Sequence, residues 1–233
     1  PNTTVDGSQI NASTFLGDSL TLEEDSSVPQ ILIYHTHSQE GFADSIEGDE
    51  ATSVVGVGNY LESILRDIYG YQVIHRKDTF DLMEGQLDRS KAYNYALPVI
   101  GQVLEENPTI QVVIDLHRDG VNESTKLVTR QNGKRMAQIM FFNGMSRTAT
   151  NGNIKYLKNP NKQTNLAFSL QLQAQAALKY PGFTRKIYVK GYRYNLHYRG
   201  RSLLVEVGAQ NNTLSEAKAS MSLLAELLNN VLY

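Results

Sequence analysis

The sequence predicts an α/β fold, a single domain in which a mixed, mostly parallel β-sheet is flanked by helices. Three short apolar runs, which begin at Ile31, Val112 and Leu203, are typical of strands buried on both faces. Segments with the three- and four-residue apolar spacing of helices lie between these runs. Strands that alternate with helices indicate a mostly parallel sheet. The length of 233 residues suits one domain of ordinary size.

Residues 1–28 are rich in Thr, Asn, Ser, Asp and Glu and show weak apolar periodicity. We expect them to form a flexible N-terminal lead-in, followed by one catalytic domain over residues 29–233. The first strand is predicted at residues 31–34. Apolar residues at helical spacing then predict a helix over 54–68.

The second half of the chain continues the alternation. A helix is predicted over 91–106 with an interruption at Pro98, and another over 165–179, which stops before Pro181-Gly182. The last helix has a capping box of Thr213 and Glu216. Weaker strands are predicted at residues 72–75, 137–142 and 186–190.

The composition excludes several classes of protein. The chain has 22 basic and 24 acidic residues, and a net charge of −2 is unfavourable for general nucleic-acid binding. The absence of Cys excludes disulfides, iron–sulfur clusters and a thiol nucleophile. No run of 18 apolar residues is present, so this sequence predicts no membrane-spanning helix.

Ionisable residues follow or end each of the three strongest strands. The first is followed by His35-Thr36-His37-Ser38-Gln39-Glu40, the middle one ends in Asp115-Leu116-His117-Arg118-Asp119, and the late one contains Glu206. Ligands of open α/β sheets bind at the carboxyl ends of strands. Two imidazoles and one carboxylate, with a fourth position left to water, are typical of a catalytic zinc site.

Each of these residues also has a purely structural interpretation. His35 and His37 could pair with each other at a strand end, and His117 could be a buried hydrogen-bonding residue. Glu206 could form a salt bridge with Arg199 or Arg201. A carboxylate in an apolar strand is costly unless it is paired or binds metal, so the functional interpretation of Glu206 is favoured. His75, which precedes two basic residues, is predicted to be a solvated strand end.

The three motifs together resemble the stage II sporulation protein P family, which belongs to the zinc-dependent N-acetylmuramoyl-L-alanine amidases. These motifs are Tyr34-His35-Thr36-His37 with Glu40, Asp115-Leu116-His117-Arg118-Asp119, and Leu204-Val205-Glu206-Val207-Gly208. The resemblance covers residues 29–233 and implies an amidase_3-like fold. It also implies a peptidoglycan hydrolase with amidase activity and endopeptidase activity on peptide crosslinks, acting during sporulation engulfment.

The same resemblance implies a location and partners. Members of the family are extracytoplasmic and membrane-anchored through an N-terminal segment that is missing from this sequence. They face the wall between mother cell and forespore. Their substrate is peptidoglycan, and their protein partners are the lytic transglycosylase stage II sporulation protein D and the membrane scaffold stage II sporulation protein M.

By resemblance, zinc is expected to be held by His35, Glu40 and His117, with Glu50 and His37 as rivals of Glu40. Glu206 matches the catalytic glutamate. It would take a proton from water and deliver it to the leaving amine.

Three further residues are expected to support this set. Asp115 and Asp119 would orient His117, and Arg201 would orient Glu206 or contact the substrate. His37, if it is not a ligand, is a fourth residue expected to orient a ligand or contact the substrate. Two alternative functions stay open at this point. One is a zinc peptidase that cuts only peptide crosslinks, and the other is a non-catalytic wall-binding module.

Overall fold

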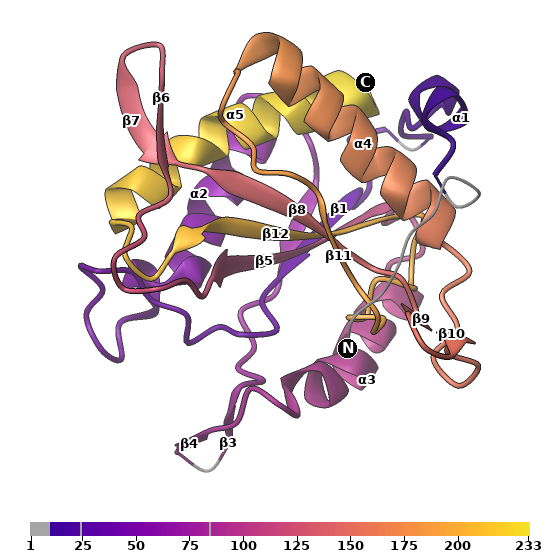
Figure 1. Ribbon diagram of the computed structural model, residues 1–233, viewed down its shortest axis with the longest axis horizontal. Coiled ribbons are helices and arrows are strands. Elements are labelled where there is room, and N and C mark those ends of the chain that lie inside the picture. Colours follow the sequence, from indigo (N-terminus) through magenta and orange to yellow (C-terminus); the bar gives the residue numbers. More distant parts are fainter. Residues whose placement is uncertain (1–9, 24, 84) are drawn as a thin grey trace.

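A six-stranded sheet forms the centre of the computed structural model, which describes residues 10–23, 25–83 and 85–233 (Figure 1). The strand order is β11-β8-β12-β5-β1-β2. Strands β2, β1, β5 and β12 are parallel, β8 is antiparallel to β12, and β11 is parallel to β8. This topology confirms the predicted mixed, mostly parallel sheet. The strands are β1 (Ile31–Tyr34), β2 (Val73–His75), β5 (Val112–Asp119), β8 (Ile139–Gly144), β11 (Tyr188–Lys190) and β12 (Arg201–Ala209).

Helices pack on both faces of the sheet. They are α1 (Ala12–Gly17), η1 (Glu50–Thr52, a 3-10 turn), α2 (Val54–Asp67), α3 (Ala92–Glu106), α4 (Lys162–Lys179) and α5 (Leu214–Leu232). The predicted capping box of α5 is present, because Thr213 and Glu216 bond reciprocally to each other's backbone N–H groups. Helix α3 runs without a break through Pro98, which removes only one backbone hydrogen bond from the helix.

Three hairpins, which the sequence analysis did not predict, extend from this framework. They pair β3 (Leu82–Met83) with β4 (Gln86–Leu87), β6 (Val128–Gln131) with β7 (Lys134–Ala137), and β9 (Arg147–Thr148) with β10 (Gly152–Asn153). The hairpin of β3 and β4 projects beyond the body of the molecule in Figure 1.

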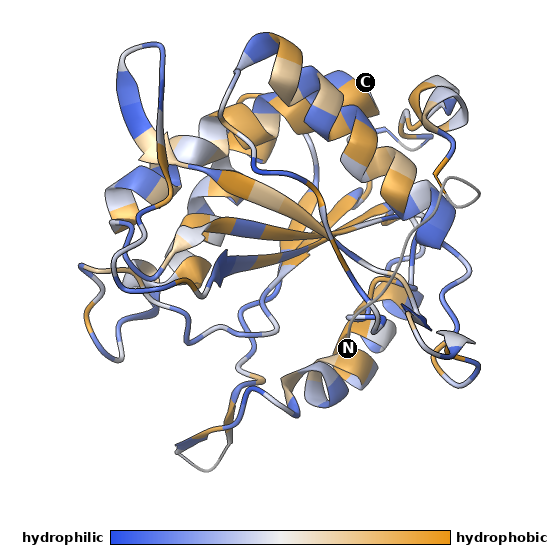
Figure 2. Cartoon of the chain, viewed as in Figure 1, coloured by the Kyte–Doolittle hydropathy of each residue, from blue (hydrophilic) through white to orange (hydrophobic). Residues whose placement is uncertain are grey.

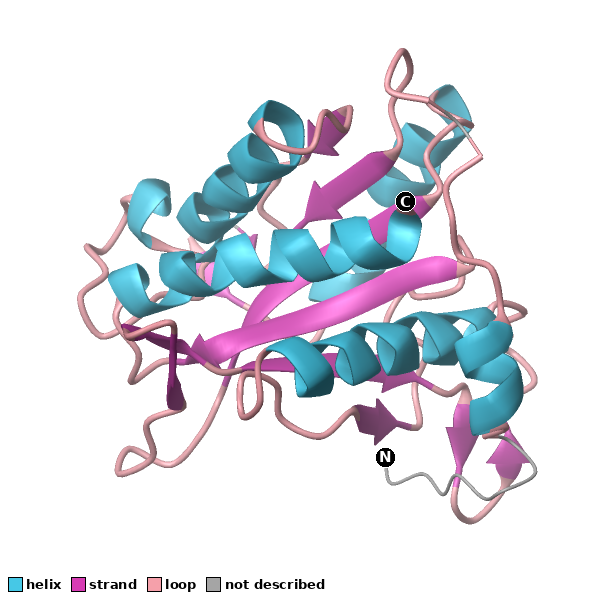
Figure 3. Cartoon of the chain, turned by 90° about the horizontal axis from the view of Figure 1, so that it is seen from above, coloured by secondary structure: helices cyan, strands magenta, loops and turns pink. Residues whose placement is uncertain are grey.

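The two faces of the sheet carry separate hydrophobic cores. Odd-numbered positions such as Ile31 and Ile33 pack in the larger core with α2, α4 and α5, whereas Leu32 and Tyr34 pack in the smaller core with α3. Figure 3 shows helices lying over the sheet, and Figure 2 shows apolar residues both on the strands and on the helices. Because successive side chains of a strand point to opposite faces, the odd-numbered and even-numbered residues of β1 pack in different cores.

The predicted lead-in contains helix α1 and two side chains that are buried against the rest of the domain. Helix α1 places Phe15 in a small apolar cluster with Leu166 of α4, and Leu20 belongs to the larger core. Burial of these side chains fixes a segment whose overall composition is polar. Residues 1–9 of the predicted lead-in lie outside the described residues. No helix among those described is long and apolar enough to cross a membrane.

Candidate metal centre

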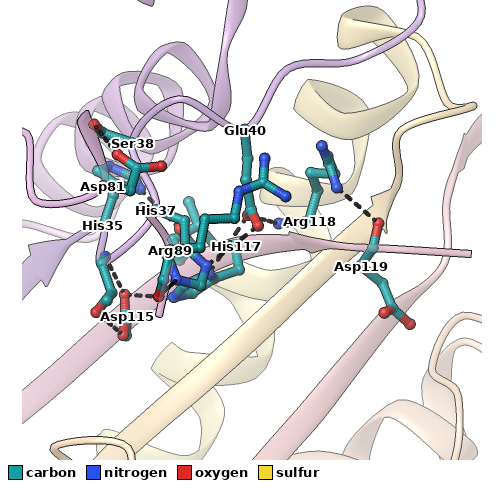
Figure 4. Close-up of polar contacts among 12 residues, drawn as sticks. His35, His37, Ser38, Glu40, Asp81, Arg89, Asp115, His117, Arg118 and Asp119 are labelled. Carbon is teal, nitrogen blue, oxygen red and sulfur yellow. Dashed lines mark hydrogen bonds and ion pairs between the residues drawn. The ribbon is translucent and has the colours of Figure 1, made fainter. Parts of the chain in front are cut away.

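His37, Glu40 and His117 bring three ligand atoms within 4.8 Å of one another (Figure 4). Nδ1 of His37 lies 3.4 Å from Glu40 Oε1, and Nδ1 of His117 lies 3.4 Å from Glu40 Oε2. Glu40 and His117 are buried, and His37 is partly exposed. The carboxylate thus lies between two imidazole nitrogens that both face it.

The turn that follows β1 positions two of these residues. The backbone N–H of Glu40 donates to the carbonyl oxygen of His37 at 3.2 Å, which folds residues 37–40 into a turn. Thr36 donates its backbone N–H and its hydroxyl to the Asp115 carboxylate, at 2.8 and 2.6 Å. The side chain of Asp115 on β5 therefore fixes the start of the turn against the neighbouring strand.

The second nitrogen of each imidazole lies near an oxygen atom. Nε2 of His117 lies 2.8 Å from Asp115 Oδ1, and Nε2 of His37 lies 3.4 Å from the carbonyl oxygen of Arg89. A metal ion that replaced the proton at Nδ1 of each ring would leave the remaining proton at Nε2, beside these oxygen atoms. This carboxylate–imidazole arrangement is the one found behind metal-ligating histidines.

The charge of Glu40 is stabilised in spite of its burial. Burial opposes ionisation, but hydrogen bonds and charge interactions with His117 and His37 hold the pKa of Glu40 well below its usual range. The backbone N–H of Arg118 donates to Glu40 Oε2 at 3.0 Å. The carboxylate is therefore ionised and available as a ligand at neutral pH.

The neighbouring carboxylates also control His117. Burial opposes its charged form, yet Asp115 and Glu40 hold the pKa of His117 well above its usual range. A metal cation that binds at Nδ1 of His117 would replace the proton at this nitrogen. This replacement explains how the carboxylates of Glu40 and Asp115 can share one site with the imidazoles of His37 and His117.

Glu206 lies on the strand next to His117. The two residues are Cα partners across β12 and β5. Oε2 of Glu206 is buried and has no hydrogen-bond partner among the described residues. Burial raises the pKa of Glu206 to about 8, and the negative charges of Glu40, Asp119 and Asp115 add to this effect. A carboxyl group with a raised pKa and a free oxygen suits proton transfer.

The structure does not bring His35 into this group, although the sequence predicts it as a ligand. Nδ1 of His35 lies 2.8 Å from the carbonyl oxygen of Leu116, and Nε2 lies 2.8 Å from Nε2 of His75. His35 continues the odd-numbered side of β1, which faces α2, and a Cβ at Gly58 of α2 would lie 2.8 Å from the imidazole. The alternation of β1 therefore directs His35 to the other face of the sheet, whereas His37 lies with Glu40 and His117.

Two other expectations are corrected. His75 is not a solvated strand end, because its side chain is 2% exposed and its Nδ1 lies 3.2 Å from Glu62 Oε2. Arg201 does not reach Glu206. It lies at the start of β12, where its guanidinium donates to the carbonyl oxygens of Leu20 and Thr21.

The remaining predicted residues divide between the site and its surroundings. Asp115 contacts His117 as expected of an orienting residue. Asp119 instead pairs with Arg185, at 2.6 Å between Oδ2 and Nη1, and its carboxylate is directed away from His117 in Figure 4. Glu50 is exposed on η1 and is not part of the donor group.

Sequence reasoning missed two residues that surround the site. Tyr93 of α3 places its ring 5.5 Å from that of His37 and stacks on His117 at 6.5 Å between centroids. The Arg89 carbonyl accepts from His37. Both residues lie in or beside a helix remote in sequence from the strand motifs, so spacing along the chain gives no signal for them.

The donor set fits a transition-metal cation such as Zn²⁺. Imidazole nitrogen and carboxylate oxygen are zinc ligands in catalytic sites, and three protein ligands leave a position for water or substrate. The acceptors behind both imidazoles and the free oxygen of Glu206 provide the surroundings that such a centre requires. The arrangement can hold a metal beside a proton-transfer group.

Comparison with known proteins gives a family match over nearly the whole chain. A family model described as Stage II sporulation protein P matches residues 2–229. The chain is 23% identical over 215 residues to the Stage II sporulation protein P of Bacillus subtilis (strain 168). The match covers 86% of this chain and 50% of that protein, so the chain spans about half the length of the curated relative.

Solved structures with the same fold include two amidases. The CwlD amidase from Clostridioides difficile, solved in complex with the GerS lipoprotein, aligns with a TM-score of 0.51 and 16% identity, over 86% of this chain and 94% of that one. An N-acetylmuramoyl-L-alanine amidase from Clostridium difficile 630 aligns with a TM-score of 0.50 and 12% identity, over 87% and 94%. At these identities the likeness establishes the fold.

Proposed function

This chain belongs to the stage II sporulation protein P family, and we propose that it is a metal-dependent hydrolase of peptidoglycan that acts in spore formation. One observation carries the proposal. The ligand atoms of His37, Glu40 and His117 converge beside Glu206, which has a free and buried carboxyl oxygen. A wall-binding module would not need a glutamate with a buried, unpartnered carboxyl oxygen at such a place, because burial of a polar atom without a partner costs stability.

We propose His37, Glu40 and His117 as the residues that hold the metal, with zinc as the best fit to the donors. When bound, zinc would supply an electrophilic centre that lowers the pKa of water to about 7 and polarises a carbonyl group. Asp115 and the Arg89 carbonyl orient the two imidazoles. Tyr93 covers the imidazoles on the side of α3 and limits the access of bulk water.

Glu206 performs the proton transfers in this proposal. It accepts a proton from the attacking water and donates it to the amine that leaves when the amide C–N bond breaks. The raised pKa of about 8 suits the second step, because a carboxylic acid that holds its proton near neutral pH is an effective general acid. The position of Glu206 beside His117 supports both steps.

The family resemblance supports a specific scissile bond, which is the amide between the lactyl group of N-acetylmuramic acid and L-Ala. Cleavage of peptide crosslinks is a second activity of the same site in this proposal. The proposed setting is the extracytoplasmic face of the membrane during engulfment. Stage II sporulation proteins D and M are the proposed partners, again by family resemblance.

Release of dye from labelled sacculi tests the hydrolase, and mass spectrometry of the products identifies the bond. Free lactyl groups with intact L-Ala-containing peptides are expected for the amidase. Products cut only within crosslinks would identify a peptidase instead. Binding to sacculi without any release, in zinc-loaded protein, would contradict the enzyme and support a wall-binding module.

A further inference from the structure

A hollow of about 280 Å³ opens beside Glu206, and none of its lining residues is His37, Glu40 or His117. Glu206 contributes to its lining together with Asp119, Arg185, Tyr188, Phe142 and Met140. Because Glu206 is the proposed proton-transfer group, a molecule in this hollow would lie next to the bond that is cut. The chemistry of the lining therefore bears on which substrate the site accepts.

Arg185 is fixed in the wall of this hollow. Its backbone N–H donates to the carbonyl oxygen of Ile139 at 2.8 Å, and its Nη1 donates to Asp119 Oδ2 at 2.6 Å. The side chain is 30% exposed, so the guanidinium reaches the open space. Asp119 is its one side-chain partner among the described residues, and a guanidinium has five N–H donors. Most of these donors stay available to a ligand.

An aromatic wall faces the same space. The rings of Tyr188 and Phe142 lie 5.6 Å apart, and Tyr188 is 43% exposed. Nζ of Lys190 lies 5.2 Å from the centre of the Tyr188 ring. The lining itself holds one guanidinium, that of Arg185, and the two carboxyl groups of Asp119 and Glu206. An oriented fork of N–H donors such as that of Arg185 suits a planar anion better than a neutral amide.

We propose that Arg185, oriented by Asp119, binds a free carboxylate of the peptide stem close to the scissile amide, and so makes the enzyme selective for acidic stems. This inference rests on the proposed function, because it takes the peptide of peptidoglycan as the substrate. In the stem, the residue after L-Ala is D-Glu, whose α-carboxylate is free in some walls and amidated in others. Discrimination between these two forms is the property that the geometry assigns to Arg185.

Two synthetic fragments test the proposal. Both are N-acetylmuramyl tripeptides L-Ala-γ-D-Glu-L-Lys with an amidated C-terminus, and they differ only in whether the α-carboxyl group of D-Glu is free or amidated. Charge-assisted hydrogen bonds predict a value of kcat/KM about ten- to a hundredfold higher for the free acid, mainly through KM. Arg185→Ala should abolish this preference by weakening the free acid alone, and Arg185→Lys should restore part of it.

Arg135→Ala is the matched control. Its guanidinium also makes a 2.6 Å bond to a carboxylate, that of Glu216, but it does not line the hollow. It should leave the preference unchanged. Equal cleavage of both fragments by the unmodified protein, or a preference that survives in Arg185→Ala, would overturn the proposal while the hydrolase stands.

Failure of the hydrolase itself gives a different result. If neither fragment is cleaved and sacculi release no dye, the affinities of the two fragments, measured by calorimetry, still show whether Arg185 binds the free carboxylate. A tighter affinity for the free acid that disappears in Arg185→Ala supports the carboxylate subsite. Equal affinities, or no binding of either fragment at millimolar concentration, overturn it.

Discussion

Glu206 and His117 lie side by side on adjacent parallel strands, as Cα partners of β12 and β5. The register of these two strands therefore sets the distance between the proposed proton-transfer group and a proposed metal ligand. Both strands are anchored in the hydrophobic cores by residues such as Leu203 and Ile114. Because a shift of one residue would turn every side chain to the opposite face, this packing protects the alignment of the site.

Glu206→Gln should reduce hydrolysis of sacculi by about 10²–10⁴-fold, the usual contribution of general acid–base catalysis. Gln keeps the shape of the side chain but cannot take up the proton. Zinc content and melting temperature should be retained, since no proposed ligand is removed. Glu123→Gln, on the exposed loop after β5, is the control and should behave like the unmodified protein. Loss of zinc would instead make Glu206 a ligand, and full activity would exclude it from catalysis.

Glu40→Gln should lower zinc content well below the roughly one ion per chain expected for a single site. The carboxylate of Glu40 is the anionic donor between the two imidazoles. Glu50→Gln provides the comparison, because Glu50 is exposed and outside the donor group. Elemental analysis after removal of loosely bound metal measures both. If Glu50→Gln lost its zinc while Glu40→Gln kept it, the carboxylate ligand would be Glu50 and not Glu40.

His37→Ala and His35→Ala should fail in different ways. His37→Ala removes a proposed ligand and should lose zinc while keeping the fold. His35→Ala removes the contacts with the Leu116 carbonyl and His75, so it should lower the melting temperature while the folded protein keeps its zinc. Zinc content per folded molecule and thermal unfolding separate these outcomes. The reverse pattern would return the ligand role to His35.

The architecture could be predicted from sequence because burial leaves a strong pattern. Strands covered on both faces are almost wholly apolar, as at Ile31–Tyr34, and helices show the three- and four-residue spacing. The short hairpins, such as that of β6 and β7, bury few side chains and gave no comparable pattern. Phe15 and Leu20 are too isolated in a polar segment for the sequence to predict that their side chains are buried.

The site could be predicted only to the level of the strand ends. The motifs placed Glu40, His117 and Glu206 together, but the choice between His35 and His37 depends on which face each side chain takes after β1 ends. The alternation of β1 gives a signal for this, since His35 shares the side of Ile31 and Ile33. Arg185 gives none, because its partner Asp119 is 66 residues away in sequence.

Asp115→Asn should weaken zinc binding by about 10–100-fold, the usual effect of changing a residue behind a metal ligand. The Asp115 carboxylate accepts from Thr36 and lies 2.8 Å from Nε2 of His117, so its charge both fixes the turn and favours a proton at Nε2 when a metal ion replaces the proton at Nδ1. Titration against a chelator of known affinity measures the change. An unchanged affinity would show that His117 is oriented without this carboxylate.

The buried pair His35 and His75 should make the protein less stable in weak acid. Burial lowers the pKa of His75 to about 4, and burial together with repulsion from His75 lowers the pKa of His35 to about 3. In the unfolded chain both titrate near 6.5, so below that pH the unfolded state binds more protons than the folded state. The stabilising contribution is therefore complete above pH 6.5 and is lost as the pH falls toward 4.

Urea unfolding at pH 8 and pH 5 measures this loss. The shift of His75 alone corresponds to a decrease on the order of 2 kcal/mol in the free energy of unfolding between these two values. His75→Gln, which keeps a donor for His35 but does not titrate, should be less sensitive to pH over this range. Glu123→Gln is the control, because it leaves both histidines in place and should retain the full dependence of stability on pH. His117→Gln would not serve, because it disturbs the metal site. An equal loss of stability in His75→Gln and in the unmodified protein would show that His75 is not the group responsible.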